Sequence, residues 1–253
     1  MRWRAWGVTD VGRRRDKNED ALLVAPALGA YAVADGMGGH AAGEVASGLA
    51  IEALREALET NGSPEPEDEG VVLRRLESAV HEANRRIWES IERHEDRRGM
   101  GTTLVAMLVL GSRAVLAHVG DSRAYVLRSG GLARLTSDHS WVAEQVKLGL
   151  LSDDDARRHP MRNIVTRALG SRPDIAMDTA VLGFREGDVV LLCSDGLNSM
   201  LTDAEIAEIL GTPGAGPEAI CRRLVAEANA RGGDDNITVV VLLAEERPED
   251  ASS

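Results

Sequence analysis

The amino-acid sequence predicts an α+β protein. Segments typical of strands and of helices both occur, and they come in blocks instead of alternating strictly along the chain. Of the 253 residues, 43% are apolar and 28% are charged, close to the average of soluble globular proteins. A chain of this length can bury a large core, so disorder is not expected over most of it.

Short apolar runs bounded by turn residues predict the strands. These runs are Trp3–Thr9, Ala21–Val24, Tyr31–Ala34, Thr103–Leu110, Ala114–His118, Ala124–Leu127, Val189–Cys193 and Ile237–Leu243. The turn Ser129-Gly130-Gly131 predicts a hairpin that continues into Leu132–Leu135.

Apolar residues at helical spacing predict the helices. The helical segments are Gly43–Leu58, Val72–Glu95, Asp203–Leu210 and Pro217–Ala230, and the apolar stripe predicted for the first is Val45, Leu49, Ala53 and Leu54. An acidic loop covers residues 59–70, and an acidic tail covers residues 245–253. Neither divides the chain into separate cores, so we expect one domain over residues 1–244 and a disordered tail.

Charge and cysteine content exclude several classes of function. With 29 basic and 41 acidic residues the net charge is −12, so the chain would repel nucleic acid. The two cysteines, Cys193 and Cys221, lie in separate apolar segments, which argues against a disulfide framework and a thiolate zinc site. No segment has the pattern of a signal peptide or a membrane span. We expect a cytoplasmic monomer that binds neither nucleic acid nor membranes.

Acidic residues recur where apolar runs end in a turn. The segments with this pattern are Asp35-Gly36, Gly120-Asp121, Asp195-Gly196 and Gly233-Asp234-Asp235, and the pair Glu19-Asp20 precedes an apolar run. One such turn is an ordinary turn former at the end of a strand. Several together predict a shared site if their strand ends meet at one edge of a sheet, because strands fix the carboxylates and glycines allow close backbone approach.

Such a cluster would need protons or cations to offset its negative charge. Two carboxylates about 4 Å apart repel by about 4 kcal/mol at an effective dielectric constant of about 20, so several pairs would rival the whole stability of a domain. The carboxyl groups must therefore be protonated or bind cations. Ligands that are all oxygen favour hard ions, so Mg²⁺ or Mn²⁺ is expected instead of Zn²⁺.

Motifs in a fixed order extend from residue 9 to about residue 243. They are Arg15-Asp16-Lys17-Asn18-Glu19-Asp20, Asp35-Gly36-Met37-Gly38-Gly39-His40, Gly101-Thr102-Thr103, Val119-Gly120-Asp121-Ser122-Arg123, Ser194-Asp195-Gly196-Leu197 and Gly233-Asp234-Asp235-Asn236-Ile237-Thr238. With these motifs the sequence resembles the metal-dependent serine/threonine protein phosphatases of type 2C, and especially their bacterial branch. The resemblance implies a central antiparallel β-sandwich flanked by helices on both sides, with a flap at about residues 136–172.

The resemblance also implies a metal centre of two ions, Mn²⁺ or Mg²⁺. Asp35 would bridge the two ions, and the carbonyl group of Gly36 would complete one coordination sphere. Asp195 and Asp235 would hold the other ion.

Further residues of the motifs would surround these ligands. Glu19 and Asp20 would act through metal-bound water, and Asp121 with Asp195 matches a third, weaker metal site of bacterial relatives. Asn236 would orient its neighbour Asp235, and Thr103 would support the ligands from outside.

Substrate binding and proton transfer follow from the same resemblance. Arg15, four residues before Glu19, would clamp the substrate phosphate with its guanidinium fork. Eukaryotic relatives have a histidine as the proposed general acid where Met37 stands here, and His40 would either replace it or be a structural loop residue. His118 and His139 are expected to be packing or loop residues.

The implied activity is hydrolysis of phosphoserine and phosphothreonine in proteins, by attack of a bridging water on phosphorus, in opposition to bacterial serine/threonine kinases. The alternative is a catalytically weak or inactive regulator of the same fold that binds phosphoproteins. Such a regulator should have lost a metal-binding aspartate, but Asp35, Asp195 and Asp235 are all present. A narrower substrate, a phosphorylated anti-sigma-factor antagonist, would go with sensory domains for which the sequence leaves no room.

Overall fold

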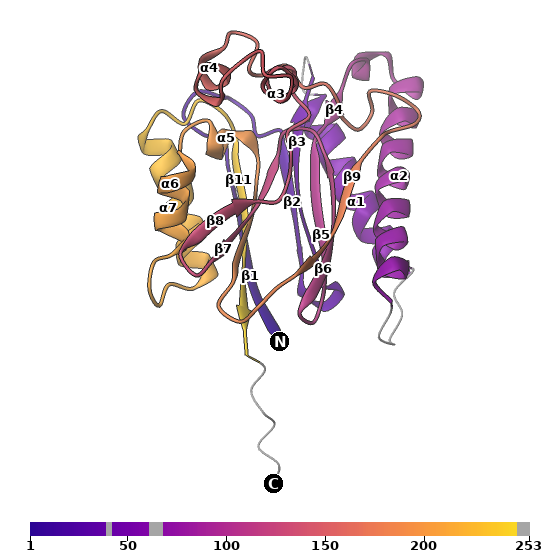
Figure 1. Cartoon of the computed structure of the whole chain (residues 1–253). Helices are drawn as coiled ribbons and strands as arrows, with labels where there is room; N and C mark the ends of the chain where they lie inside the picture. The colour runs from indigo at the N-terminus through magenta and orange to yellow at the C-terminus, as the bar shows by residue number, and fades with distance from the viewer. Residues whose placement is uncertain (39–41, 61–67, 247–253) are drawn as a thin grey trace.

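Two antiparallel sheets lie face to face, and helices cover both outer faces (Figure 1). The computed structural model describes residues 1–38, 42–60 and 68–246. The order of the layers is helices, sheet, sheet, helices, which confirms the α+β class and the helix-flanked sandwich.

The first sheet contains both ends of the described chain. Its strands, in spatial order, are β1 (Arg2–Asp10), β11 (Ile237–Glu245), β10 (Val189–Cys193), β7 (Arg123–Arg128) and β8 (Gly131–Arg134). The predicted hairpin joins β7 to β8 through Ser129 and Gly130, whose φ angles of 49° and 81° are those of a tight hairpin turn.

The second sheet contains two strands that the sequence did not predict. Its strands, in spatial order, are β2 (Asp20–Ala25), β3 (Ala30–Met37), β5 (Leu104–Leu110), β6 (Arg113–Val119) and β9 (Asp178–Gly183), and β4 (Gly101–Thr102) pairs with the end of β3. β4 is only two residues long, and β9 is a largely exposed edge strand without an apolar run. Neither therefore carries a strong strand signal.

The helices divide between the two outer faces. Beside the second sheet lie α1 (Gly43–Thr60) and α2 (Glu69–Arg93), beside the first lie α5 (Asp195–Asn198), α6 (Asp203–Leu210) and α7 (Pro217–Ala230), and short 3₁₀ helices cover Pro26–Leu28 and Glu95–Arg97. The stripe predicted for α1 was partly wrong: Val45 and Leu49 are only partly buried, while Ala46, Ala50 and Ile51 are buried. The small alanine side chains let α1 approach the sheet closely.

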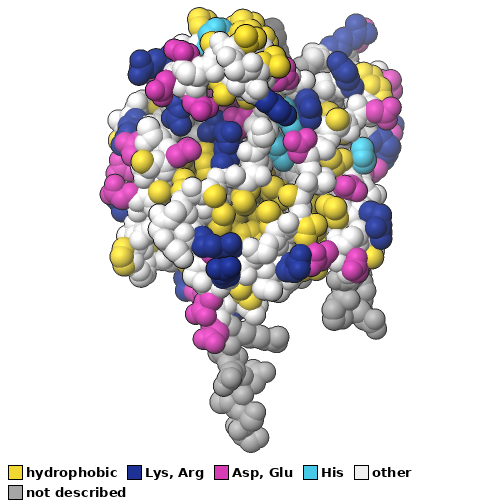
Figure 2. Space-filling view, in the orientation of Figure 1, with side chains coloured by type: hydrophobic (Ala, Val, Ile, Leu, Met, Phe, Trp, Pro, Cys, Tyr) yellow, Lys and Arg dark blue, Asp and Glu magenta, His cyan; other side chains and the backbone are white. Residues whose placement is uncertain are grey.

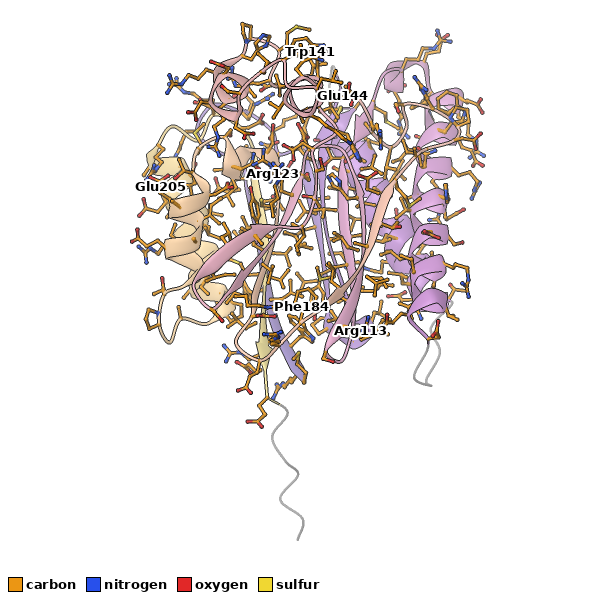
Figure 3. All side chains as sticks on the ribbon, in the orientation of Figure 1. Arg113, Arg123, Trp141, Glu144, Phe184 and Glu205 are labelled. Carbon is orange, nitrogen blue, oxygen red and sulfur yellow. The ribbon has the colours of Figure 1, made fainter. Side chains whose placement is uncertain are left out.

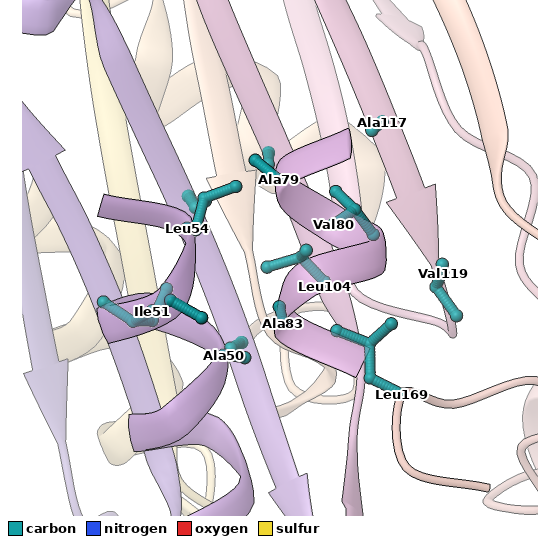
Figure 4. Packing of buried hydrophobic residues seen from close by; sticks show 14 of the residues in the cluster. Ala50, Ile51, Leu54, Ala79, Val80, Ala83, Leu104, Ala117, Val119 and Leu169 are labelled. Atoms are coloured by element: carbon teal, nitrogen blue, oxygen red, sulfur yellow. The ribbon is translucent and has the colours of Figure 1, made fainter. Parts of the chain in front are cut away.

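Three apolar layers hold the sandwich together. Between the sheets, Tyr31, Val33 and Val105 pack with Val190 and Leu192 from the opposite side. Figure 4 shows the layer beneath α1 and α2, with Leu54, Val80 and Leu104 among its members. The central strands are buried on both faces, which is why they are continuous apolar runs in the sequence.

A segment at residues 136–172 lies across the end of the sandwich and contains α3 (Trp141–Lys147) and α4 (Asp153–Arg158) (Figure 1). Large apolar side chains are exposed there, namely Leu148, Leu150, Met161 and Ile164, and apolar atoms gather at the top of the space-filling view (Figure 2). None of the helices within the described ranges is long and apolar enough to cross a bilayer.

The acidic turns of the sequence come together at this same end. In the register of β2 and β3, Asp20 lies directly opposite Asp35. β10 ends beside the start of β11, with Cys193 opposite Val239, so Asp195 and Asp235 flank the same pair of strand ends. The antiparallel order of both sheets therefore assembles acidic residues from distant parts of the chain.

Candidate active site

Of the two carboxylate oxygens of Asp20, one has a hydrogen-bond partner among the described residues and the other has none. Its Oδ2 atom accepts a hydrogen bond of 2.8 Å from the hydroxyl of Ser194. Its Oδ1 atom is buried and has no hydrogen-bond partner among the described residues. An unpaired buried carboxylate oxygen is costly, and a cation or a proton would remove that cost.

The acidic side chains form one electrostatic unit. Burial, together with the charges of Asp195 and Asp235, raises the pKa of Asp20 to about 7, against hydrogen bonds that lower it. Burial, and then repulsion from Asp20 and Asp195, raises the pKa of Asp35 well above its usual range. Burial and repulsion from Asp195 do the same to Asp121. The structure thus brings together the aspartates that the sequence placed in separate turns.

Two more acidic groups belong to this unit. Burial and repulsion from Asp235 raise the pKa of Asp195, although a hydrogen bond with Asp35 opposes the shift. Burial also raises the pKa of Glu19, which the positive charge of Arg15 partly offsets.

The end of β3 is held in place by two threonines. The backbone amide of Asp35 donates to the hydroxyl of Thr103 at 3.1 Å, and the amide of Thr103 donates to the carbonyl of Asp35 at 2.9 Å. The hydroxyl of Thr102 donates to that same carbonyl at 2.9 Å. Thr103 also shares a hydrogen bond of 2.7 Å with the hydroxyl of Ser122, so it links Asp35 to the turn of Asp121.

Two glycines allow backbone segments to meet around the acidic residues. A Cβ atom on Gly36 would collide with the carbonyl oxygens of Glu19 and Gly43, and one on Gly196 would collide with the carbonyl of Asn236. Glycine is therefore required at both positions for reasons of space, which accounts for the Asp-Gly pairs.

Asn236 holds the loop that carries Arg15 and Glu19. Its side-chain oxygen accepts the amide of Glu19 at 2.8 Å, and its side-chain nitrogen donates to the carbonyls of Val11 and Lys17, both at 2.9 Å. Its contact with Asp235 is made by the backbone amide, at 2.8 Å. The side chain thus orients the facing loop, a role that the sequence did not predict, because the prediction concerned only the neighbour Asp235.

Arg15 lies on the rim of the cluster. Its Nη2 atom donates to Asp235 Oδ2 at 2.7 Å, and 53% of its side chain is exposed. That hydrogen bond is the main reason why the pKa of Arg15 is raised. His40, the candidate general acid, lies outside the described residues.

Two further polar groups support the cluster, and sequence analysis did not single them out. The hydroxyl of Ser194 donates a hydrogen bond to Asp20 and accepts one from the backbone amide of Thr238 at 3.0 Å. Arg123, labelled in Figure 3, follows the turn of Asp121 and pairs with Asp138 through bonds of 2.6 to 3.1 Å. Ser194 directly precedes Asp195, and Arg123 lies two residues after Asp121, so position within the motifs was the available signal.

The donor set fits hard cations. Within the described ranges no three acidic, histidine or cysteine side chains stand close enough to hold one ion by themselves. An ion here would need water and backbone carbonyl oxygens besides carboxylates, and Mg²⁺ and Mn²⁺ accept such ligands. The buried, unpaired Oδ1 of Asp20 and the mutual repulsion of the aspartates both favour positive charge at this position.

Comparison with known proteins agrees with the geometry. A family model described as "Protein phosphatase 2C" matches residues 12–219. The serine/threonine phosphatase stp of Listeria monocytogenes serovar 1/2a is 42% identical over 241 residues, which are 92% of this chain and 93% of the relative. The solved structure of the Mycobacterium tuberculosis serine/threonine phosphatase PstP/Ppp has a TM-score of 0.89 and 39% identity, and covers 97% of this chain and 100% of that chain.

A second solved structure was determined with metal. The catalytic domain of the serine/threonine protein phosphatase PstP in complex with two manganese ions has a TM-score of 0.86 and 37% identity, and covers 96% of this chain and 98% of that chain. The ordered acidic motifs, the helix-flanked sandwich and the matched family model agree, and the chain belongs to the protein phosphatase 2C family.

Proposed function

We propose that this chain is a metal-dependent protein phosphatase that hydrolyses phosphoserine and phosphothreonine in proteins. The observation that carries the proposal is the acidic cluster at one end of the sandwich, in which burial and repulsion from neighbouring aspartates raise the pKa values of Asp20, Asp35 and Asp195. Membership of the phosphatase family and the names of the relatives support it.

The cluster would hold two ions, Mn²⁺ or Mg²⁺. Asp35, the carbonyl of Gly36, Asp195 and Asp235 would hold the two ions together with water. Glu19 and Asp20 would bind through water, and Asp121 with Asp195 would hold a third, weaker ion. When bound, the ions would supply positive charge for the phosphoryl oxygens and would lower the pKa of water so that it can attack phosphorus.

Arg15 would bind the substrate phosphate. A guanidinium carries five N–H donors, so Arg15 can keep its bond to Asp235 and still present two parallel donors to phosphate oxygens. The bond to Asp235 holds the exposed side chain beside the cluster before substrate arrives. Arg15 therefore contributes both charge and orientation to the phosphoryl group.

We further propose that residues 1–244 act as one catalytic domain with a flap at residues 136–172. The apolar layer shared by the two sheets supports a single folding unit. The protein would act as a monomer in the cytoplasm, in signal transduction by serine/threonine kinases, because phosphate on serine and threonine is the product of such kinases. His40 is a candidate proton donor to the leaving group.

The first prediction compares two neighbouring aspartates. Asp235→Asn should lower Mn²⁺-dependent hydrolysis of a phosphothreonine peptide by about 100-fold, because it removes a carboxylate from the cluster. Asp234→Asn is the matched control, since Asp234 is exposed and lies 3.8 Å from Arg14, and its activity should stay within about twofold. Equal activity of the two variants, or full activity of the parent in EDTA, would contradict the proposed function.

The second prediction concerns phosphate binding. Arg15→Lys should raise KM for the phosphopeptide by about tenfold, because an ammonium group cannot donate two parallel hydrogen bonds to phosphate. The control is Arg14→Lys, an exposed neighbour that should leave KM unchanged. Steady-state kinetics at saturating Mn²⁺ would show the difference. An unchanged KM in Arg15→Lys would contradict the role of Arg15 in phosphate binding.

The third prediction is a pH dependence of metal binding. Because the pKa of Asp20 is raised to about 7, a proton competes with the cation below that pH. The dissociation constant for Mn²⁺ should therefore rise by about tenfold for each pH unit below about 7. Titration calorimetry at pH 6 to 8 in two buffers of different ionisation enthalpy should also detect proton release on binding. An affinity that does not change over this range would contradict the prediction.

A further inference from the structure

His139 lies at the start of the flap segment and hydrogen-bonds both backbone polar groups of Gly120, at the end of the sandwich that carries the acidic residues. Only 6% of its side chain is exposed. Its backbone amide donates to the carbonyl of Gly120 at 2.7 Å, and its ring nitrogen Nδ1 accepts the amide of Gly120 at 3.1 Å. Its carbonyl accepts the amide of Thr166 at 2.8 Å, from the other side of the flap segment. His139 therefore joins both sides of the flap segment to Gly120.

The contacts of the ring identify its tautomer. Nδ1 must be unprotonated to accept the amide of Gly120, so a neutral ring carries its proton on Nε2. That proton faces Asp178 Oδ2, 3.3 Å from Nε2.

Arg167 is a neighbour that disfavours this tautomer. Its Nη1 atom lies 3.2 Å from Nε2, but it also donates to Asp178 at 3.2 Å and its side chain is 43% exposed. The opposite tautomer would leave the buried amide of Gly120 without its acceptor, which costs free energy. Arg167 has another partner and Gly120 would lose its acceptor, so the Nε2–H form is favoured.

The backbone of Gly120 is tightly packed against Thr103, beside the acidic cluster. Gly120 has a φ of 108°, and a Cβ atom there would lie 2.6 Å from the Cβ of Thr103. Thr103 in turn accepts the amide of Asp35. The next residue is Asp121, whose buried carboxylate is repelled by Asp195. A displacement of the Gly120 peptide would therefore move Asp121 relative to the other carboxylates.

We propose that His139 is a positioning residue that fixes the turn of Gly120 and Asp121 through Nδ1, so that the carboxylate of Asp121 stays directed at a cation of the cluster. The role of Asp121 as a metal ligand rests on the proposed function, whereas the hydrogen bonds between His139 and Gly120 do not. The contact with Asp178 on β9 orients the imidazole and selects its tautomer, as acidic partners of histidines do elsewhere.

The neighbouring charges are compatible with a neutral ring. Burial lowers the pKa of His139 against the hydrogen bond with Asp178, which raises it. The ring of His118 stacks on it with centroids 4.8 Å apart. Burial, and then His139, lowers the pKa of His118 to about 4, so this second ring is also neutral near pH 7.

Two substitutions of His139 each keep one hydrogen bond of the ring and remove the other. In His139→Asn the side-chain oxygen can occupy the place of Nδ1 and accept the amide of Gly120. In His139→Gln the side-chain amide can replace Nε2 opposite Asp178, and the acceptor for Gly120 is lost. Both variants lose the stacking on His118, so that loss is common to the pair.

Amide hydrogen exchange of Gly120 in the metal-free protein, followed by NMR, is the direct measurement. The Gly120 amide should exchange at least about tenfold faster in His139→Gln than in His139→Asn. Mn²⁺ binding to the weakest site, followed by calorimetry, should be about tenfold weaker in the Gln variant and should recover most of its strength in the Asn variant. Equal exchange and equal binding in the two variants would overturn the proposal.

The outcomes distinguish this proposal from the proposed function. Slow exchange of the Gly120 amide in the Asn variant and fast exchange in the Gln variant support the hydrogen bond from Gly120 to Nδ1, even if no phosphopeptide is hydrolysed. Faster exchange of the Gly120 amide in His139→Gln without weaker Mn²⁺ binding would overturn the claim that His139 positions Asp121. If both variants unfold, nitrogen-15 NMR of the parent ring decides, because the proposal requires an unprotonated Nδ1 near pH 7, and a protonated Nδ1 would overturn it.

Discussion

Buried carboxylates that repel their neighbours dominate the electrostatics of the active-site end. Asp20, Asp35 and Asp195 share one end of the sandwich, where burial and repulsion from neighbouring aspartates raise their pKa values. A carboxyl group whose pKa is raised on folding contributes stability below its ordinary pKa, and this contribution is lost as the pH rises through the raised value. For Asp20 that value is about 7, so without cations the folded chain is penalised near neutral pH and above. Divalent cations would remove the penalty.

The fold withstands this repulsion because the acidic residues sit on rigid elements. Asp20 and Asp35 are opposite each other in a sheet ladder, and three apolar layers hold the two sheets and their helices together. Gly36 and Gly196 let backbone segments meet without room for a side chain. Asn236 fastens the loop that carries Arg15 to β11. Charge is thus concentrated on elements that strand pairing, packing and hydrogen bonds hold in place, as a preorganised site requires.

Much of this arrangement could be predicted from the sequence, because the signals are local. Apolar runs that end in Asp-Gly turns indicated both the buried strands and Asp35 and Asp195. Long-range contacts carry no such signal: the amide of Glu19 meets Asn236 across 217 positions of the chain. Likewise His139 was expected to be a packing or loop residue, because nothing near it in the sequence shows that it faces Gly120. The stripe of α1 was misjudged because its alanines, which pack closest to the sheet, contribute little to an apolar pattern.

We expect the acidic cluster to destabilise the metal-free fold and cations to remove that destabilisation. Urea unfolding at pH 8 of the parent and of Asp35→Asn, each in EDTA and in saturating Mn²⁺, measures both effects. In EDTA the variant should be more stable than the parent by about 1 kcal/mol or more, because one repelling charge is gone, and with Mn²⁺ the parent should become the more stable protein. A variant that is less stable than the parent in EDTA would contradict the claim.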